Sequence, residues 1–251
     1  MISLGHLDLN VVENCTMRCV SCSHASPFTN TRTWQMTPEE LAADLAAIKP
    51  FVRFHRLQMV GGEPLLNKRL PELMRVARAS GVGQEVMVIT NGQLLPRMPD
   101  EFWSTLDTLQ LSIYPKLDPD IPAYAKAACA KFGKAFYSTT YTEFHQQFRA
   151  TPGDGSNFTN CHWKSDCWTL HRGHFYLCPQ SAFFPKNFMG LADNVDGLPL
   201  ADLTEEKFLG FINRTEPLSA CRICMANEMK TKPWREAKTK EEWLENSTLP
   251  K

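Results

Sequence analysis

Three cysteines within eight residues constrain this chain more than any other feature of its sequence. They are Cys15, Cys19 and Cys22 in the stretch ENCTMRCVSC. A closed structural metal site takes four protein ligands, so this group is one ligand short. The three thiolates can hold three irons of a [4Fe-4S] cube and leave the fourth iron open to a ligand from outside the protein. Alternatively, they can hold zinc together with a remote ligand such as His24.

The remaining composition narrows the class of protein. The nine cysteines form short-spaced groups, which is typical of metal binding or redox chemistry in a reducing compartment, so we expect a cytoplasmic protein. The 27 basic and 27 acidic side chains give no electrostatic reason to expect a nucleic-acid or membrane partner. No stretch approaches the roughly 18 to 20 apolar residues of a membrane span. A small-molecule substrate is therefore favoured.

Apolar periodicity predicts alternating strands and helices up to about residue 140. Strands are expected at 7–12, 56–60, 85–90, 108–113 and about 135–139. Helices are expected from Pro38 to Pro50, at 70–80, near 99–106 and at about 122–132. Such alternation predicts an α/β fold with a parallel sheet, either open or curled into a barrel.

Polar and glycine-rich residues follow four of these strands. Because the carboxyl ends of parallel strands meet at one edge of a sheet, we expect them on one rim. Each taken alone is also consistent with a plain turn or a strand hydroxyl. Together with the three cysteines they indicate a functional site that includes Gly61, Gly62, Glu63, Pro64, Asn91 and Ser112.

The order of these motifs resembles the radical S-adenosylmethionine (radical SAM) superfamily. CTMRCVSC after the first strand, GGEP after the second and TNG after the third carry the resemblance, which covers about residues 5 to 140. It implies an abridged, partial TIM-like (β/α) barrel and a [4Fe-4S] cluster bound by Cys15, Cys19 and Cys22. The amine and carboxylate of S-adenosylmethionine would then chelate the open iron.

The resemblance also implies roles for the other rim residues. Gly61 to Pro64 would present backbone acceptors to the cofactor amine, because glycine lets the backbone approach a ligand closely, with Glu63 as a further anchor. Asn91 and Ser112 would contact its ribose and carboxylate. One position departs from the pattern: many members carry an aromatic residue before the third cysteine, where this chain has Ser21.

The character of the sequence changes after residue 150. The stretch TPGDGSN at 151–157 is turn-rich and predicts a linker, so we expect a radical SAM core at 1–150 and a second domain at 151–251. A hairpin is expected over 168–178, turning near Gly173, and Cys129 is interpreted as a core residue of the first domain. The second domain carries five cysteines: Cys161, Cys167, Cys178, Cys221 and Cys224.

The spacing of these cysteines resembles a twitch domain, a shortened relative of the SPASM domain, with a β-hairpin and a helix. The order of gaps is most similar to that of 2-deoxy-scyllo-inosamine dehydrogenases. The resemblance implies an auxiliary [4Fe-4S] cluster held by Cys178, Cys221 and Cys224 with either Cys161 or Cys167. A four-cysteine zinc site remains the alternative. Cys167 is either without a role or a hydrogen donor to a substrate radical.

These features predict an oxidoreductase or epimerase. It would cleave S-adenosylmethionine reductively to a 5′-deoxyadenosyl radical, which takes a hydrogen atom from a sugar, an aminocyclitol or a nucleotide-linked molecule. A flavodoxin or ferredoxin would supply the electron. The expected first strand near residue 7 leaves no leader-binding domain before it, which disfavours a peptide-modifying enzyme. A radical SAM enzyme that modifies a peptide recognised by a separate partner remains the first alternative. The second alternative is a non-catalytic iron-sulfur or zinc protein for electron transfer or binding.

Overall fold

The computed structural model describes residues 1–29, 33–228 and 230–247 and divides into two compact units. The first unit comprises residues 1–16 and 33–142, and the second comprises residues 17–32 and 143–251. The division after residue 142 comes before the boundary expected at 150. The second unit also takes in the loop that carries Cys19 and Cys22, because this loop packs on the C-terminal part of the chain.

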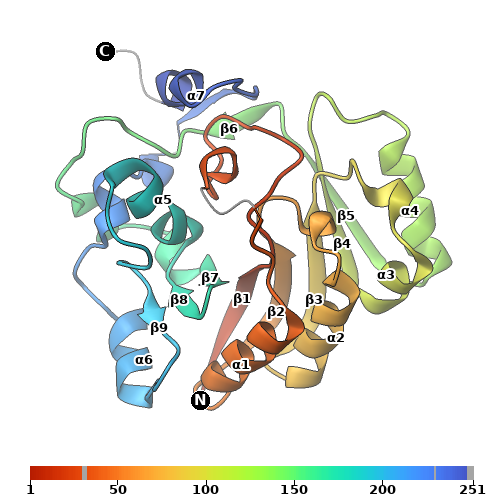
Figure 1. The fold of residues 1–251 in the computed structure, drawn as a ribbon, viewed down its shortest axis with the longest axis horizontal. Coiled ribbons are helices and arrows are strands. Elements are labelled where there is room, and N and C mark those ends of the chain that lie inside the picture. Colours follow the sequence, from red (N-terminus) through yellow and green to blue (C-terminus); the bar gives the residue numbers. More distant parts are fainter. Residues whose placement is uncertain (30–32, 229, 248–251) are drawn as a thin grey trace. The chain divides into compact units, whose positions relative to one another are not determined.

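Five parallel strands in sequence order form the sheet of the first unit (Figure 1). They are β1 (Ile2–Asn10), β2 (Val52–Val60), β3 (Gly83–Thr90), β4 (Thr108–Ile113) and β5 (Ala135–Thr140). The connecting helices are α1 (Pro38–Ile48), α2 (Leu70–Ser80), α3 (Asp100–Thr105) and α4 (Ile121–Lys131). The expected αβ alternation is confirmed, and the strands do not close into a barrel.

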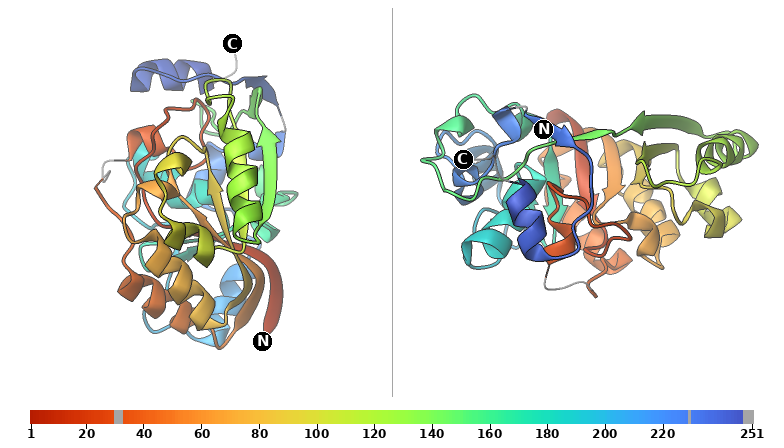
Figure 2. Two further views of the ribbon diagram at one scale, coloured as in Figure 1. Left: turned by 90° about the vertical axis from the view of Figure 1, so that its right-hand side faces the viewer. Right: turned by 90° about the horizontal axis from the view of Figure 1, so that it is seen from above.

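Local sequence signals explain where these helices begin and end. Thr37 accepts the backbone N–H of Glu40, whose carboxylate in turn accepts the N–H of Thr37, so α1 begins with a capping box. Helix α2 ends at Gly81, whose φ of 66° is a conformation that suits glycine. Figure 2 shows α4 lying alongside β5. Cys129 on α4 is 1% exposed, as expected of a core residue.

Strand β1 begins five residues earlier than the sequence indicated. It pairs with β2 from Ile2↔Val52 to Asn10↔Val60 in one continuous parallel register. The early residues alternate between half-buried and exposed positions, and their apolar pattern is weak. Pairing with β2 therefore extends the strand beyond the part that its own pattern predicts.

The second unit contains antiparallel strands and three helices. Strands β7 (Trp168–His171) and β8 (His174–Tyr176) form the expected hairpin, which turns through Arg172 and Gly173 with positive φ angles of 47° and 70°. Strand β9 (Leu198–Pro199) pairs with β8, and β6 (Glu143–His145) pairs with β10 (Thr231–Pro233). The helices are α5 (Pro179–Met189), α6 (Glu205–Ile212) and α7 (Lys240–Ser247), where one helix was expected.

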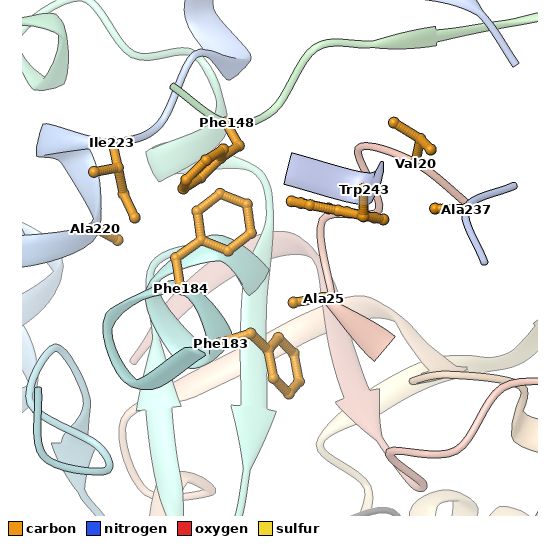
Figure 3. Close-up of a cluster of buried hydrophobic side chains, with 9 residues drawn as sticks. All are labelled: Val20, Ala25, Phe148, Phe183, Phe184, Ala220, Ile223, Ala237 and Trp243. Atoms are coloured by element: carbon orange, nitrogen blue, oxygen red, sulfur yellow. The ribbon is translucent and has the colours of Figure 1, made fainter. Parts of the chain in front are cut away.

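An apolar cluster forms the centre of the second unit (Figure 3). Trp243 of α7 is fully buried there, and its ring stacks on that of Phe188 at 5.2 Å between centroids. The side chains of the cluster come from the cysteine loop, from the segment after β6, from α5 and from residues 220–243. They are Val20, Ala25, Phe148, Phe183, Phe184, Ala220, Ile223, Ala237 and Trp243. In the described part of the chain, no helix is long and apolar enough to cross a membrane.

Candidate functional site

The Gly61-Gly62 turn lies directly against the segment that leads into Cys15. The N–H of Gly62 donates to the carbonyl of Val12 at 2.8 Å, and the N–H of Glu63 donates to that of Asn14 at 2.7 Å. A Cβ atom on Gly62 would stand 2.0 Å from the Asn14 carbonyl oxygen, and Gly61 has a φ of 139°. The close approach that requires glycine is therefore to the chain's own backbone.

Glu63 joins this turn to the loop after β3. Its side chain is 1% exposed and accepts hydrogen bonds from Thr90 Oγ1 at 2.6 Å and from the N–H groups of Asn91 and Leu65 at 2.9 and 3.1 Å. Burial raises the pKa of Glu63 to about 7, although the hydrogen bonds oppose the shift. Both carboxylate oxygens are thus engaged by groups of the chain itself.

Asn91 reaches the first cysteine. Its Nδ2 lies 3.9 Å from Cys15 Sγ and donates to Thr16 Oγ1 at 2.9 Å, while its Oδ1 accepts the N–H of Gln93. Ser112 is 7% exposed and stands opposite Thr139 in the register of β4 and β5. The first unit therefore gathers the Gly-Gly-Glu turn, Asn91 and Cys15, and Ser112 stands on β4, the strand beside β3.

The second unit holds Cys19 and Cys22. Cys19 is buried, and its sulfur accepts a hydrogen bond from Trp234 Nε1 at 3.3 Å. Burial, together with the nearby Cys22 thiol, raises the pKa of Cys19 to about 12. The Cys22 sulfur lies 3.9 Å from Ser26 Oγ. The contact between Trp234 and Cys19 could not be predicted from the sequence, because no local pattern links residues that are 215 positions apart.

His24 packs against an aromatic side chain of the second unit. The ring packs on Phe183 at 5.6 Å between centroids, and its Nδ1 contacts Ser23 Oγ at 3.2 Å. Burial, together with His171, lowers the pKa of His24 to about 4. Among the described residues, no three His, Cys, Asp or Glu side chains are grouped tightly enough to hold a single metal ion.

Four cysteines of the second unit line one pocket. They are Cys161, Cys178, Cys221 and Cys224, and apolar neighbours of the same pocket include Phe158, Leu177 and Leu218. Cys167 is absent from the lining, although it stands near Cys161 in the sequence. Its backbone N–H donates to the Trp163 carbonyl at 2.9 Å.

Specific contacts hold the segments that carry these cysteines. The Asp196 carboxylate accepts the N–H groups of Ser219 and Ala220 at 2.7 and 2.8 Å, which fixes the 3-10 helix Ser219–Arg222. Cys178 is the residue before α5, and its carbonyl accepts from Ser181 Oγ at 2.7 Å. The Cys224 sulfur accepts the N–H of Ala226 at 3.4 Å. The pocket is therefore built by contacts between distant parts of the second unit.

The pocket thiols are poorly solvated. Burial raises the pKa of Cys178 to about 12 and that of Cys221 to about 11, and it raises the pKa of Cys224 as well. Neighbouring cysteines of the same group contribute to each shift. A positively charged metal centre would favour the thiolate forms, so such a group suits metal binding.

The fold and the sites define the class of protein. The first unit combines a parallel αβ sheet, a first strand that leads into Cys15, and a Gly-Gly-Glu turn that contacts the segment before Cys15. Residues 9–114 match the Radical SAM superfamily. The matched region contains Cys15, Cys19 and Cys22, the Gly61–Pro64 turn, Asn91 and Ser112.

Curated relatives match part of the chain. GTP 3′,8-cyclase of Chlorobaculum tepidum is 31% identical over 112 residues, which cover 44% of this chain and 33% of the relative. An S-adenosylmethionine-dependent nucleotide dehydratase of Lacinutrix mariniflava is 27% identical over 147 residues, covering 56% and 30%. The chain thus spans about a third of the length of these relatives.

A solved structure resembles the fold over more of the chain. The crystal structure of BtrN in complex with AdoMet and 2-DOIA superimposes with a TM-score of 0.57 at 14% identity. The match covers 84% of this chain and 83% of BtrN. The partial-barrel expectation for the fold is therefore confirmed.

Proposed function

We propose that this chain is a radical SAM oxidoreductase or epimerase with two iron-sulfur clusters that acts on a small molecule. The radical SAM core would occupy residues 1–150, and a twitch-like auxiliary domain would occupy residues 151–251. When bound, the first cluster and S-adenosylmethionine supply the 5′-deoxyadenosyl radical that abstracts a hydrogen atom from the substrate. The protein supplies the thiolates, the orientation of the substrate and the exclusion of water.

Cys15, Cys19 and Cys22 would hold the first cluster. The donors near two of these sulfurs support the assignment, since Asn91 Nδ2 approaches Cys15 and Trp234 Nε1 donates to Cys19. Such donors are typical of the surroundings of iron-sulfur thiolates. A centre with three thiolates retains an open iron for S-adenosylmethionine.

The Gly61-Gly62-Glu63-Pro64 turn and Asn91 would lie beside the bound cofactor. The turn contacts the backbone of Val12 and Asn14, and Asn91 contacts the side chains of Cys15 and Thr16; both observations support this assignment. Glu63 would act by positioning this turn and the loop of Asn91, since both of its carboxylate oxygens accept hydrogen bonds from the chain. Ser112, at a neighbouring strand end, would contribute a hydroxyl to the cofactor.

The pocket of four cysteines is the observation that carries the proposal of an auxiliary cluster. Cys161, Cys178, Cys221 and Cys224 supply the four thiolates that a closed [4Fe-4S] cluster needs. Because Cys161 lines the pocket and Cys167 does not, Cys161 is favoured over Cys167 as the fourth ligand. Such a cluster would accept an electron from a substrate radical, which favours net oxidation. Cys167 would be the candidate hydrogen donor, the role that epimerisation requires.

Metal analysis of anaerobically reconstituted protein tests the two-cluster proposal. Two cubes predict about eight irons and about eight sulfides per chain, with little zinc. About four irons together with one zinc would instead indicate a zinc site at the pocket of four cysteines and would remove the auxiliary cluster from the proposal.

The similar proteins also bear on the class of substrate. The fold likeness to a structure that contains 2-DOIA favours a small polar molecule, and the curated relatives include enzymes named for GTP and for nucleotides. We therefore propose a sugar, an aminocyclitol or a nucleotide-linked molecule as substrate, with a flavodoxin or ferredoxin as reductant.

A further inference from the structure

The C-terminal segment 234–243 is paired with the loop of Cys19. Residues Cys19 and Glu236 form an antiparallel bridge. The N–H of Val20 donates to the Arg235 carbonyl at 2.9 Å, and the N–H of Ala237 donates to the Arg18 carbonyl at 3.0 Å. These contacts join two segments that are more than 200 positions apart in the sequence.

Two indole groups of this segment donate to Cys19 itself. Trp234 Nε1 donates to the sulfur at 3.3 Å, and Trp243 Nε1 donates to the carbonyl at 2.8 Å. Trp243 is fully buried in the apolar cluster, beside Val20 and Ala237 in Figure 3. Trp243 therefore holds the backbone of the Cys19 loop. Trp234 donates a hydrogen bond to the Cys19 sulfur, the atom that would bind iron.

Hydrogen bonds to the sulfurs of an iron-sulfur centre help to set its reduction potential. An N–H donor stabilises the more negative, reduced state more than the oxidised state, and its effect is greatest where water is excluded. Cys19 is buried and its hydrogen bond with Trp234 is part-buried, so the Trp234 N–H acts where access of water to the sulfur is reduced.

We propose that Trp234 tunes the cluster held by Cys15, Cys19 and Cys22 and raises its reduction potential. This inference rests on the proposed function of those cysteines. One electron passes to the cluster from an external reductant, a flavodoxin or ferredoxin in the cell and dithionite in the test tube. No protein bond forms or breaks in this step. Trp234 is a positioning residue that acts through Cys19, and it lies outside the region that matches the superfamily.

Trp234→Phe tests the proposal, because it retains an aromatic ring and removes the N–H donor. The matched control is Trp168→Phe. Trp168 is 4% exposed, and no hydrogen-bond partner of its indole nitrogen is present in the described part of the chain. Replacement of Trp234 with benzothienylalanine, which keeps the bicyclic shape without an N–H, separates the lost hydrogen bond from lost packing.

The measurement is a redox titration followed by EPR, read on the signal that changes when S-adenosylmethionine is added. We expect both Trp234 replacements to shift the midpoint to more negative potential. At the wild-type midpoint, the ratio of reduced to oxidised cluster should fall by a factor of about three to ten, and Trp168→Phe should titrate as wild type.

An unchanged midpoint in both Trp234 replacements, with the responsive signal intact, would overturn the role of Trp234 and leave the proposed function standing. A shift in Trp234→Phe that is absent with benzothienylalanine would also overturn it, since packing alone would then explain the change. Wild-type protein with full iron but no signal that responds to S-adenosylmethionine would overturn the proposed function, and this inference with it.

Discussion

Glu63 shows how one buried side chain links two loops of the site and makes stability depend on pH. Its pKa is raised to about 7 from an ordinary value of 4.5, mainly by burial. Between these values the folded protein keeps a proton that the unfolded chain releases. The stabilising contribution is therefore complete below about pH 4.5 and is lost as the pH rises through about 7.

Glu63→Gln removes this titration. From pH 5 to pH 7.5 we expect wild-type apoprotein to lose about 2 kcal/mol of unfolding free energy relative to the variant. Urea unfolding of both proteins at the two pH values measures the difference, and replacement of an exposed glutamate of α6, Glu206→Gln, serves as the control. Parallel pH dependence of wild type and Glu63→Gln would show that Glu63 does not retain the proton.

Gly62 is the residue whose replacement should disturb the first cysteine most directly without changing a ligand. A Cβ would meet the Asn14 carbonyl oxygen at 2.0 Å, and that contact is with backbone, which cannot move aside as a flexible side chain would. We expect Gly62→Ala to cost about 1–3 kcal/mol and to lower the iron bound at the first site.

Thermal unfolding and iron analysis of Gly62→Ala check this expectation. Gly210→Ala is the control, because Gly210 lies in α6 and a Cβ there meets no neighbouring atom within 4 Å. The expectation is wrong if Gly62→Ala retains both wild-type stability and a full complement of iron.

At the scale of elements, local signals predicted most of the first unit and little of the second. The capping box at Thr37 and the glycine at position 81 mark the ends of α1 and α2 on their own. The second unit depends on contacts between distant segments, such as the bridge between Phe148 and Cys224. Helix α5 does carry a local signal, because Pro179 stands in its first turn and Gly190 at its end. These two residues would have predicted a helix between them.

Some residues of the candidate site could likewise be predicted from the sequence, and others could not. Cys15, Cys19, Cys22 and the Gly-Gly-Glu turn follow from short motifs, whereas the choice between Cys161 and Cys167 needs the folded chain. Only Cys161 lines the pocket with Cys178, Cys221 and Cys224. The contact of Trp234 with Cys19 had no signal in the sequence, since nothing local relates the two residues.

The pocket of four cysteines makes a direct prediction. Cys161→Ala should lower the iron content from about eight to about four per chain, because one cluster loses a ligand. Cys167→Ala should keep about eight. Iron and sulfide analysis after anaerobic reconstitution distinguishes the two variants. Loss of iron from Cys167→Ala with none from Cys161→Ala would reverse the assignment.

At the scale of the whole molecule, the region that matches the Radical SAM superfamily covers only part of the chain. Residues 9–114 carry the match, while the pocket of four cysteines and the segment 234–243 lie beyond it. These later parts would supply the auxiliary cluster and the contacts that adjust the first cluster. Under the proposed function, the choice of substrate and reaction would therefore depend on the second unit.

Formation of 5′-deoxyadenosine tests the central proposal most directly. Reconstituted protein would be reduced with dithionite in the presence of S-adenosylmethionine, alongside Cys15→Ala and the buried thiol control Cys129→Ala. We expect 5′-deoxyadenosine from wild type and Cys129→Ala and almost none from Cys15→Ala. Wild-type protein with fully loaded clusters that forms no 5′-deoxyadenosine would contradict the account.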